Sequence, residues 1–420
     1  MNLRRCLLAA ALAFPILAVA PAAPVVAVPG AGSAVSAPDL TDDTTVTSTF
    51  PAYTRFNVPA EDGSRDRVIE DEIVALADGV PAGSYIRGAM YSWTSPVVAD
   101  ALARAAARGV VVRVVVDREG EGGVNLDSAN AAIRKLRVAN LDNLVFCGAS
   151  SASVAGSSAC IANQSNSINH NKFFTFSTSG TMKRVVLITS QNLTFSQNNL
   201  FNNALVVHED YDLYDHFTRY FNLMRAEDKD NDFFAAPDGY YKSPNTGVTV
   251  YHSPRSSGDT VKNVLSYVTR YESGCVVEVA QAAFTNPRTA VASELLRIAK
   301  LGCQVRVVFG EMGDRVYGIL RGSSNVQMKK YWDAEASNYD GRVVTVHSKY
   351  LVVKGNYNGT GGRNIVFTGS HNLTGPSLLA HDETFVKIEH PTISANYRAN
   401  FATLWSRAKC VNPDNGTCAY

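Results

Sequence analysis

The hydrophobic pattern of the chain predicts the same order of elements twice. In the first half, residues 85–93 read as a strand, residues 97–108 as a helix with apolar side chains three and four positions apart, and residues 110–117 as a buried β-branched strand. Three segments of the second half repeat this order: residues 275–284, 289–301 and 303–311. Strand–helix–strand runs of these lengths predict a βαβ unit in each half.

A second repeat follows each of these units. In both copies a His-x-Lys triplet opens an apolar strand, and a later apolar strand ends in an Asn-Leu-Thr turn. The copies span residues 170–207 and 347–388, and an aromatic helical pattern follows each of them, over residues 214–224 and 397–405. The chain therefore consists of two similar halves.

The halves divide where proline, glycine, serine and asparagine collect, between residues 238 and 258. We predict an N-terminal half over residues 38–245 and a C-terminal half over residues 246–420. The alternation of strands and helices predicts an α/β fold in which each half is a mixed, mostly parallel sheet flanked by helices. A pseudo-twofold axis between the halves would bring the two repeated motifs face to face.

The N-terminus has the layout of a secretory signal peptide. Arg4 and Arg5 precede an apolar run over residues 7–20, which is too short to span a bilayer comfortably, and small residues and prolines follow it. An uncleaved membrane anchor is the alternative. We assign residues 1–37 to a signal peptide with a pro-like segment, and we expect a secreted, extracellular protein.

The charge of the chain argues mildly against a nuclease. The full chain has 39 Lys and Arg against 38 Asp and Glu. Removal of residues 1–37 takes away Arg4 and Arg5 and no acidic residue, which leaves 37 basic and 38 acidic side chains. Proteins that bind nucleic acid non-specifically normally carry a clear basic excess, although a local basic patch can take its place.

Six cysteines lie beyond the N-terminal segment: Cys147, Cys160, Cys275, Cys303, Cys410 and Cys418. An even number in an exported chain favours disulfide bonds, and six cysteines allow fifteen pairings, of which the sequential one is the simplest. Free buried thiols are the alternative. The spacings do not match a zinc site, and no other group of residues suggests a metal, so we expect no cofactor.

The two His-x-Lys triplets are the candidate catalytic groups. Residues i and i+2 of a strand project to the same face, so His170 should project with Lys172, and His347 with Lys349. A single triplet is more often the edge of a surface strand. Two copies, each followed at a similar separation by an Asn-Leu-Thr turn, are hard to reach by chance.

On these residues the chain resembles the phospholipase D superfamily. The signature of that family is His-x-Lys-x4-Asp followed by a Gly-Ser-x-Asn turn, present twice. The turn asparagines match at Asn192 and Asn372. The resemblance covers nearly all of the chain after the N-terminal segment, and it implies a phospholipase D fold with both motifs in one active site.

Two parts of the signature are changed in this chain. Ser177 and Lys354 stand where the motif has aspartate, and Thr189 stands where the first turn has glycine. Family members that lack the aspartate can remain active, because it is not the group that touches phosphorus. Its loss favours phosphodiester substrates other than lipids, and it leaves a catalytically silent protein as an alternative.

The resemblance implies a role for each motif residue. The lysines and the asparagine amides would stabilise the negative charge on the non-bridging oxygens of a phosphodiester. One histidine would attack phosphorus and form a phosphohistidine. The other would protonate the leaving alkoxide and then activate water or an acceptor alcohol.

The position eleven residues beyond each turn asparagine matches the family's acidic partner of histidine. Glu383 stands there in the second copy and Asn203 in the first. A carboxylate beside His347 would raise its pKa and favour the imidazolium, whereas His170 beside an amide would stay neutral. We therefore predict His170 as the nucleophile and His347 as the general acid and base, as the resemblance also implies. A solvated Glu383 without a role is the alternative.

Three functions are compatible with these residues. The first is a secreted, monomeric phospholipase D that binds a phospholipid head group at a membrane surface and releases phosphatidate and the head-group alcohol. The second is an exported, metal-independent nuclease or other phosphodiesterase with the same catalytic residues. The third is an inactive module that binds phosphate-bearing surfaces, and the retention of both histidines, both lysines and both asparagines argues against it.

Overall fold

The computed structural model describes residues 50–140, 144–333 and 344–410. The predicted signal peptide over residues 1–37 lies outside the described residues, and so does Cys418. Within the described residues, no helix combines the length and the hydrophobicity needed to cross a bilayer.

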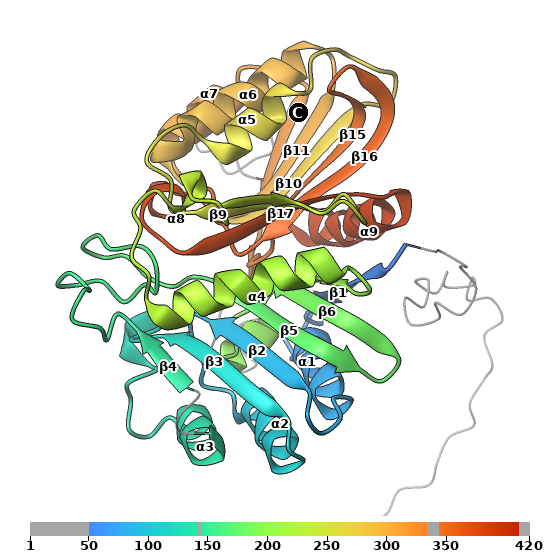
Figure 1. Cartoon of the computed structure of the whole chain (residues 1–420). Helices are drawn as coiled ribbons and strands as arrows, with labels where there is room; N and C mark the ends of the chain where they lie inside the picture. The colour runs from blue at the N-terminus through green and yellow to red at the C-terminus, as the bar shows by residue number, and fades with distance from the viewer. Residues whose placement is uncertain (1–49, 141–143, 334–343, 411–420) are drawn as a thin grey trace, which may run out of the picture. The chain divides into compact units, whose positions relative to one another are not determined.

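Seven strands form the first sheet, in the order β1-β7-β6-β5-β2-β3-β4 (Figure 1). Their bounds are Ala52–Asn57 (β1), Tyr85–Met90 (β2), Val111–Asp117 (β3), Leu144–Cys147 (β4), Lys172–Ser179 (β5), Met182–Thr189 (β6) and Asn202–Val207 (β7). One face packs against α1 (Val68–Asp78), α2 (Pro96–Ala107) and α3 (Ala131–Asn140), and the other against α4 (Tyr211–Ala226).

The second sheet has the order β18-β12-β11-β10-β15-β16-β17-β9-β8. Its strands are Tyr240–Lys242 (β8), Thr249–Ser253 (β9), Val276–Phe284 (β10), Gln304–Met312 (β11), Val326–Lys330 (β12), Lys349–Tyr357 (β15), Thr360–Gly369 (β16), Glu383–Glu389 (β17) and Lys409–Cys410 (β18). A separate pair joins Trp332–Asp333 (β13) to Val344–Thr345 (β14). The helices are Thr260–Ser266 (α5), Thr289–Lys300 (α6), Asp314–Leu320 (α7), Gly375–Leu379 (α8) and Pro391–Arg407 (α9).

The strand orders confirm the two similar halves. Read in the direction that starts at β9, the second sheet follows β9-β17-β16-β15-β10-β11-β12, which matches β1-β7-β6-β5-β2-β3-β4 strand for strand. Each half contains two parallel pairs: β2 with β3 and β3 with β4 in the first, and β10 with β11 and β11 with β12 in the second. The other neighbouring strands pair antiparallel, and short turns impose that direction on β5 with β6 and on β15 with β16, but not on β1 with β7, β2 with β5 or β10 with β15. The sheets are therefore mixed, with fewer parallel pairs than the sequence predicts.

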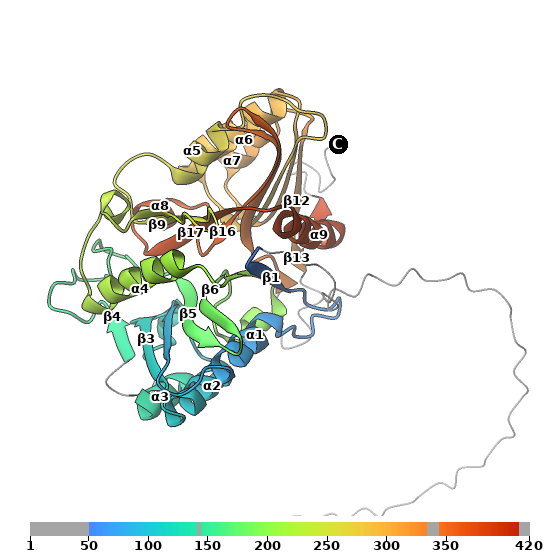
Figure 2. The same cartoon turned by 45° about the vertical axis from the view of Figure 1, so that its right-hand side comes forward.

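One core joins the halves. The helices α4 and α9 lie between the two sheets (Figures 1 and 2), and their aromatic side chains Phe217, Phe221, Tyr397 and Phe401 are fully buried there. These side chains belong to a single apolar cluster with residues from both sheets. The described residues between 50 and 410 consequently form one compact unit. The strand β8 already belongs to the second sheet although it precedes residue 245, and the predicted domain boundaries stay predictions.

Two disulfide bonds follow the sequential pairing. Cys147 bonds to Cys160, and Cys275 bonds to Cys303. The second bond ties together the starts of the neighbouring parallel strands β10 and β11. The third predicted pair cannot be followed, because Cys418 lies outside the described residues.

Candidate active site

The two His-x-Lys triplets meet where the halves contact each other. Each histidine lies two residues before the strand that its lysine opens, β5 or β15. The backbone N–H of His170 donates to the carbonyl oxygen of Asp382 at 3.0 Å, and that of His347 donates to Phe201 at 2.9 Å. Each motif is therefore held by the main chain of the opposite half. This exchange brings the two triplets together, as the repeat predicts.

Glu383 pairs with His170 and not with His347. The Nδ1 atom of His170 lies 2.8 Å from Oε1 of Glu383, whose side chain is fully buried at the start of β17. The hydroxyl of Ser370 donates to the other carboxylate oxygen at 2.5 Å. The predicted pairing within one half is wrong, because β17 enters the site beside the first-half motif.

His347 has an amide partner, Asn202. Its Nδ1 lies 2.9 Å from Oδ1 of Asn202, which also accepts from the hydroxyl of Ser190 at 2.9 Å. Ser190–Asn202–His347 is thus the counterpart of Ser370–Glu383–His170. Asn202 follows Ser190 by 12 residues, whereas Glu383 follows Ser370 by 13.

The counterpart of Glu383 is consequently Asn202, and the prediction of Asn203 is wrong by one position. The second copy has one extra residue between its turn and its strand. Counting eleven positions from the turn asparagine in both copies therefore reaches Asn203 in the first copy and not Asn202. Asn203 instead accepts from the backbone N–H of Lys349 at 3.0 Å. The hydroxyl of each turn serine identifies the counterpart in the structure, where it bonds to Asn202 and to Glu383, but no sequence signal separates Asn202 from Asn203.

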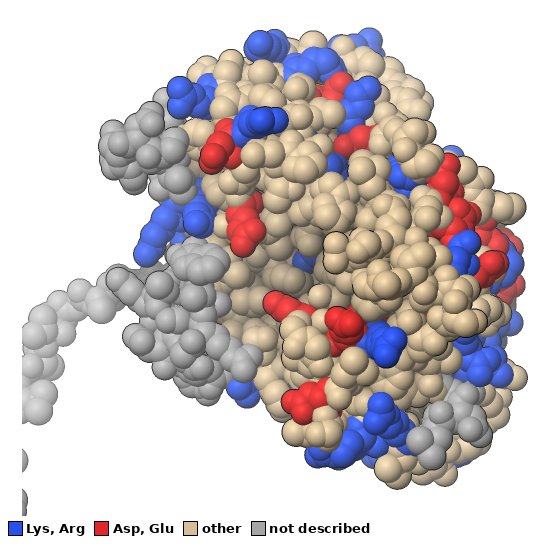
Figure 3. All heavy atoms as spheres, turned by 90° about the vertical axis from the view of Figure 1, so that its left-hand side faces the viewer, with Lys and Arg blue, Asp and Glu red and all other residues tan. Residues whose placement is uncertain are grey.

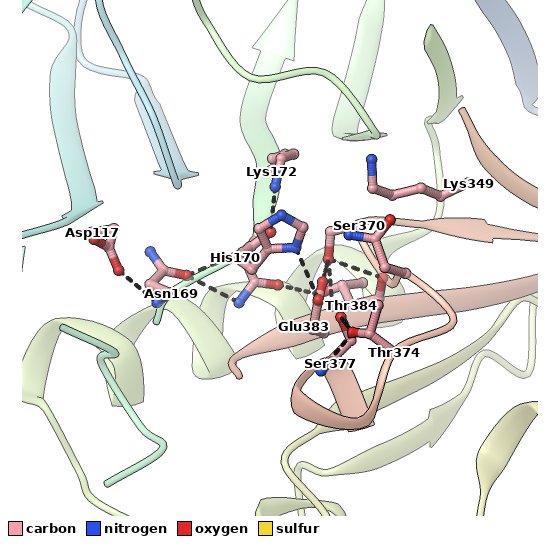
Figure 4. A network of polar contacts seen from close by, with 12 residues as sticks. Asp117, Asn169, His170, Lys172, Lys349, Ser370, Thr374, Ser377, Glu383 and Thr384 are labelled. Atoms are coloured by element: carbon pink, nitrogen blue, oxygen red, sulfur yellow. Dashed lines mark hydrogen bonds and ion pairs between the residues drawn. The ribbon is translucent and has the colours of Figure 1, made fainter. Parts of the chain in front are cut away.

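The two lysines bring positive charge into the buried site. Lys172 and Lys349 are each 1% exposed. The ammonium of Lys172 donates to the carbonyl oxygen of His170 at 2.7 Å. The ammonium of Lys349 donates to the carbonyl oxygen of His347 at 2.8 Å, and it lies 3.2 Å from both ring nitrogens of that histidine. In Figure 4 both lysines lie on one side of the His170 ring and Glu383 on the other. Buried ammonium groups without a carboxylate contact favour an anion between them.

Burial lowers the pKa values of both lysines. Burial lowers the pKa of Lys172 to about 7, against the opposing effects of Glu383, Glu121 and Asp117. Burial and the charge of Lys172 lower the pKa of Lys349 well below its usual range. A bound phosphodiester anion would reverse both effects, since an opposite charge favours the ammonium form.

Both catalytic candidates are neutral imidazoles in the free site. Burial, followed by the two lysines, lowers the pKa of His170 and of His347 well below 6.5. The predicted rise in the pKa of His347 is therefore wrong, because its carboxylate is on the other histidine and an ammonium lies against its ring. Burial raises the pKa of Glu383, while His371 and Lys172 oppose that rise.

The turn asparagines have unused hydrogen-bonding groups. The side-chain Oδ1 atoms of Asn192 and Asn372 are buried and have no partner among the described residues. In the second turn Gly369 has a φ of +148°, and an added Cβ would collide with the carbonyl oxygen of Thr384, which explains the glycine. In the first turn Thr189 fits, and its hydroxyl donates to the carbonyl oxygen of Asn203 at 2.9 Å.

The changed motif positions lie away from the catalytic groups. Ser177 is on β5, five residues beyond Lys172, and its hydroxyl accepts from the backbone N–H of Tyr85 at 2.9 Å. Lys354 is exposed at the equivalent place on β15. The replacement of the motif aspartate therefore leaves the contacts of both histidines intact.

Sequence reasoning also missed an aromatic neighbour of the nucleophile candidate. The ring centroid of Tyr91 lies 5.1 Å from that of His170, and the ammonium of Lys172 lies 5.3 Å from the Tyr91 centroid. Tyr91 follows the last residue of β2, and a pattern of apolar residues gives no sign that this position faces the site. Across the described ranges, no group of three or more His, Cys, Asp or Glu side chains is arranged to hold a metal ion.

Comparison with known families agrees with this geometry. The family model described as "Cardiolipin synthase, PLD-like domain" matches residues 81–225 and 273–405, which together are more than half of the chain. The chain belongs to the phospholipase D superfamily. Each of the two matched segments contains one His-x-Lys triplet and one turn asparagine of this phospholipase D-like protein. No curated protein matches the sequence.

Solved structures share the phospholipase D-like fold. A phosphatidylserine synthase from Haemophilus influenzae has a TM-score of 0.58 at 12% identity, over 84% of this chain and 88% of that one. A polyphosphate kinase from Porphyromonas gingivalis has a TM-score of 0.54 at 15% identity. That match covers 84% of this chain and 47% of the kinase, so the chain spans about half the length of the kinase. At these identities the likeness shows the fold alone.

Proposed function

We propose that the protein is a secreted phosphodiesterase of the phospholipase D type. It hydrolyses glycerophospholipids to phosphatidate and a head-group alcohol through a phosphohistidine on His170. The observation that carries the proposal is the contact of His170 with Glu383 beside the buried ammonium groups of Lys172 and Lys349. Neutral imidazole next to uncompensated positive charge suits attack on a phosphate anion.

The hydrogen bonds of His170 define its role in the first step. The Nδ1–H group donates to Glu383, so the lone pair on Nε2 is free to attack phosphorus. As the Nε2–P bond forms and the P–O bond to the leaving alcohol breaks, positive charge develops on the imidazole ring. The Glu383 carboxylate stabilises that charge, while the two lysines stabilise the non-bridging oxygens.

His347 supplies the proton for the leaving oxygen. Its Nδ1–H donates to the neutral oxygen of Asn202, which leaves Nε2 as the proton-carrying atom. The approaching phosphate anion raises the pKa of His347, so that an imidazolium forms next to the substrate. After proton transfer to the alkoxide, neutral His347 takes a proton from water while the water oxygen bonds to phosphorus. The Nε2–P bond then breaks and releases neutral His170. An alcohol in place of water gives transfer of the phosphatidyl group.

Acidic side chains near the site favour a lipid over a nucleic acid. Glu119 and Glu121 are exposed on the loop after β3, and neither carboxylate has a salt bridge among the described residues. The loop is anchored beside Tyr91, because the backbone N–H of Glu121 donates to the hydroxyl of Ser92 at 2.7 Å. Figure 3 shows Asp and Glu side chains around a hollow, and atoms of Lys or Arg are visible inside it. Such a rim repels a polyanion, whereas a single phosphodiester with a small head group can enter.

The proposed site of action is extracellular. The N-terminal sequence pattern and the two disulfide bonds support it, since disulfides persist in oxidising compartments. We propose a monomer that takes its substrate from a membrane surface.

A direct assay separates the proposed function from its alternatives. The purified protein is incubated with phosphatidylcholine vesicles and with plasmid DNA, both in EDTA. We expect choline and phosphatidate to appear while the plasmid stays intact, because the side chains themselves supply the positive charge. Nicked plasmid with intact lipid would identify a nuclease. A failure to cleave either substrate or bis-p-nitrophenyl phosphate would identify an inactive binding module.

A further inference from the structure

A buried pair of histidines lies behind the catalytic groups. His216 is on α4 of the first half and His252 is on β9 of the second, and each is 1% exposed. Their Nε2 atoms are 3.1 Å apart. Neither residue belongs to a His-x-Lys motif, and neither has a role in the proposed reaction steps.

Hydrogen bonds connect this pair to the residues next to His170 and Glu383. The Nδ1 atom of His252 lies 3.2 Å from the hydroxyl of Thr384, which donates to Oδ1 of Asn171 at 2.6 Å. Thr384 directly follows Glu383, and Asn171 directly follows His170. The pair therefore contacts both catalytic segments through one hydroxyl group.

The two bonds between these segments lie on opposite faces. Asn169 and Asp382 form a parallel bridge, so the two catalytic segments run side by side in extended conformation. Successive side chains of extended chains alternate between faces. The His170–Glu383 bond consequently faces the substrate, and the Asn171–Thr384 bond faces the histidine pair. A shift of the Asn171–Thr384 bond would therefore displace the His170–Glu383 bond.

The direction of each hydrogen bond fixes the tautomers of the pair. Thr384 gives its single hydroxyl proton to Asn171, so its oxygen accepts from Nδ1–H of His252. Neutral His252 then has a lone pair on Nε2, which accepts from Nε2–H of His216. Burial keeps both rings neutral: it lowers the pKa of His216 to about 4 and that of His252 well below 6.5.

Aromatic rings pack against both histidines of the pair. Tyr220 stacks on His252 with ring centroids 3.6 Å apart, and Tyr241 stacks on His216 at 4.6 Å. Asp238, which also binds Arg219, has Oδ1 3.6 Å from Nδ1 of His216. The pair is thus packed between aromatic rings and ends at a charged group near the surface.

The arrangement is specific to the half that carries the nucleophile candidate. Behind His347, the equivalent positions are Ser348 and Asn203. The hydroxyl of Ser348 has no partner among the described residues, and Asn203 donates to the hydroxyl of Thr368 at 2.7 Å. The two halves otherwise match strand for strand, so the histidine pair is an addition on the His170 side.

We propose that His216 and His252 are positioning residues that set the orientation of His170 and Glu383 for attack on phosphorus. They act through Thr384 and Asn171 and do not touch the substrate. This inference rests on the proposed function, because it concerns the rate of that reaction. A small misplacement of a nucleophile is enough to lower turnover strongly.

Three variants test the inference with bis-p-nitrophenyl phosphate as the substrate. His252→Phe keeps a ring of similar size but removes both hydrogen bonds, and we expect kcat to fall about 10- to 100-fold with KM within about twofold. His252→Asn retains an N–H donor close to the Nδ1 position, and it should restore most of the lost kcat. Thr384→Val should lower kcat as much as His252→Phe does. His208→Phe, at a partly exposed histidine after β7, is the matched control and should behave as the unaltered protein.

The double variant distinguishes positioning from a general loss of stability. If both residues act through one hydrogen bond, His252→Phe combined with Thr384→Val should lose no more kcat than either single variant. Losses that multiply, or a kcat of His252→Phe equal to that of the unaltered protein, would overturn the inference. Should His252→Phe fail to fold, an unchanged kcat in Thr384→Val would overturn it instead. An unaltered protein that cleaves no diester would overturn the proposed function itself.

Discussion

Replacing His170 with alanine should lower the turnover of bis-p-nitrophenyl phosphate by at least about 10⁴-fold. His170 is the imidazole whose Nδ1–H is held by a buried carboxylate, which leaves Nε2 for attack on phosphorus. The variant keeps both lysines, so we expect it to bind the diester with a KM close to that of the unaltered protein. Release of p-nitrophenol, followed at 400 nm or thereabouts, measures the loss.

The control for this variant is His208→Ala, which removes a histidine outside the site. His208 is half-buried after the end of β7, and its backbone N–H bonds to Pro51. We expect its turnover to equal that of the unaltered protein. Retained activity in His170→Ala would show that another residue attacks phosphorus.

Replacing Glu383 with glutamine should lower kcat by about 10²- to 10⁴-fold. Glutamine keeps the shape of the side chain but loses the charge that stabilises the positive ring of the phosphohistidine. It can also present an N–H group to Nδ1 of His170, which would force the proton onto Nε2 and block attack. The effect should fall on kcat and leave KM nearly unchanged, because Glu383 contacts His170 and not the phosphate.

A matched control for Glu383 exists on the same strand. Glu389 is the last residue of β17 and pairs with Arg363 at a partly exposed position. Glu389→Gln removes the same charge from the same strand, and its kcat should stay within about twofold of the unaltered protein. A loss in Glu383→Gln no larger than the loss in Glu389→Gln would contradict the role given to Glu383.

The repeated pattern of apolar residues predicts most of the fold. The β-branched runs of β3 and β11 and the apolar spacing of α2 and α6 predict the same βαβ unit twice. The bond between Cys275 and Cys303 agrees with the sequential pairing, the simplest of the fifteen. The sheets contain more antiparallel pairs than the sequence predicts, because the apolar pattern does not give the direction in which strands pair.

The sequence predicts which residues form the site, but it does not predict which partner each histidine contacts. The motif residues themselves carry the chemistry, and the structure brings His170, His347 and both lysines together. Which carboxylate serves which histidine depends on how the start of β17 crosses between halves. The first copy is one residue shorter than the second between its turn and its strand. The same count in both copies therefore does not reach Asn202. The pair His216–His252 arises from α4 and β9, elements far apart in the sequence, and no local pattern signals it.

The central claim is that two histidines from opposite halves act on one phosphorus atom, with His170 as the nucleophile. His347→Ala tests it most directly when the variant is mixed rapidly with bis-p-nitrophenyl phosphate and digested for mass spectrometry. The p-nitrophenolate leaving group needs no proton, so the first step proceeds, while loss of the base slows hydrolysis of the intermediate. We predict a burst of p-nitrophenol and a phosphoryl adduct on His170. An adduct on any other residue, or steady turnover without an adduct, would contradict it.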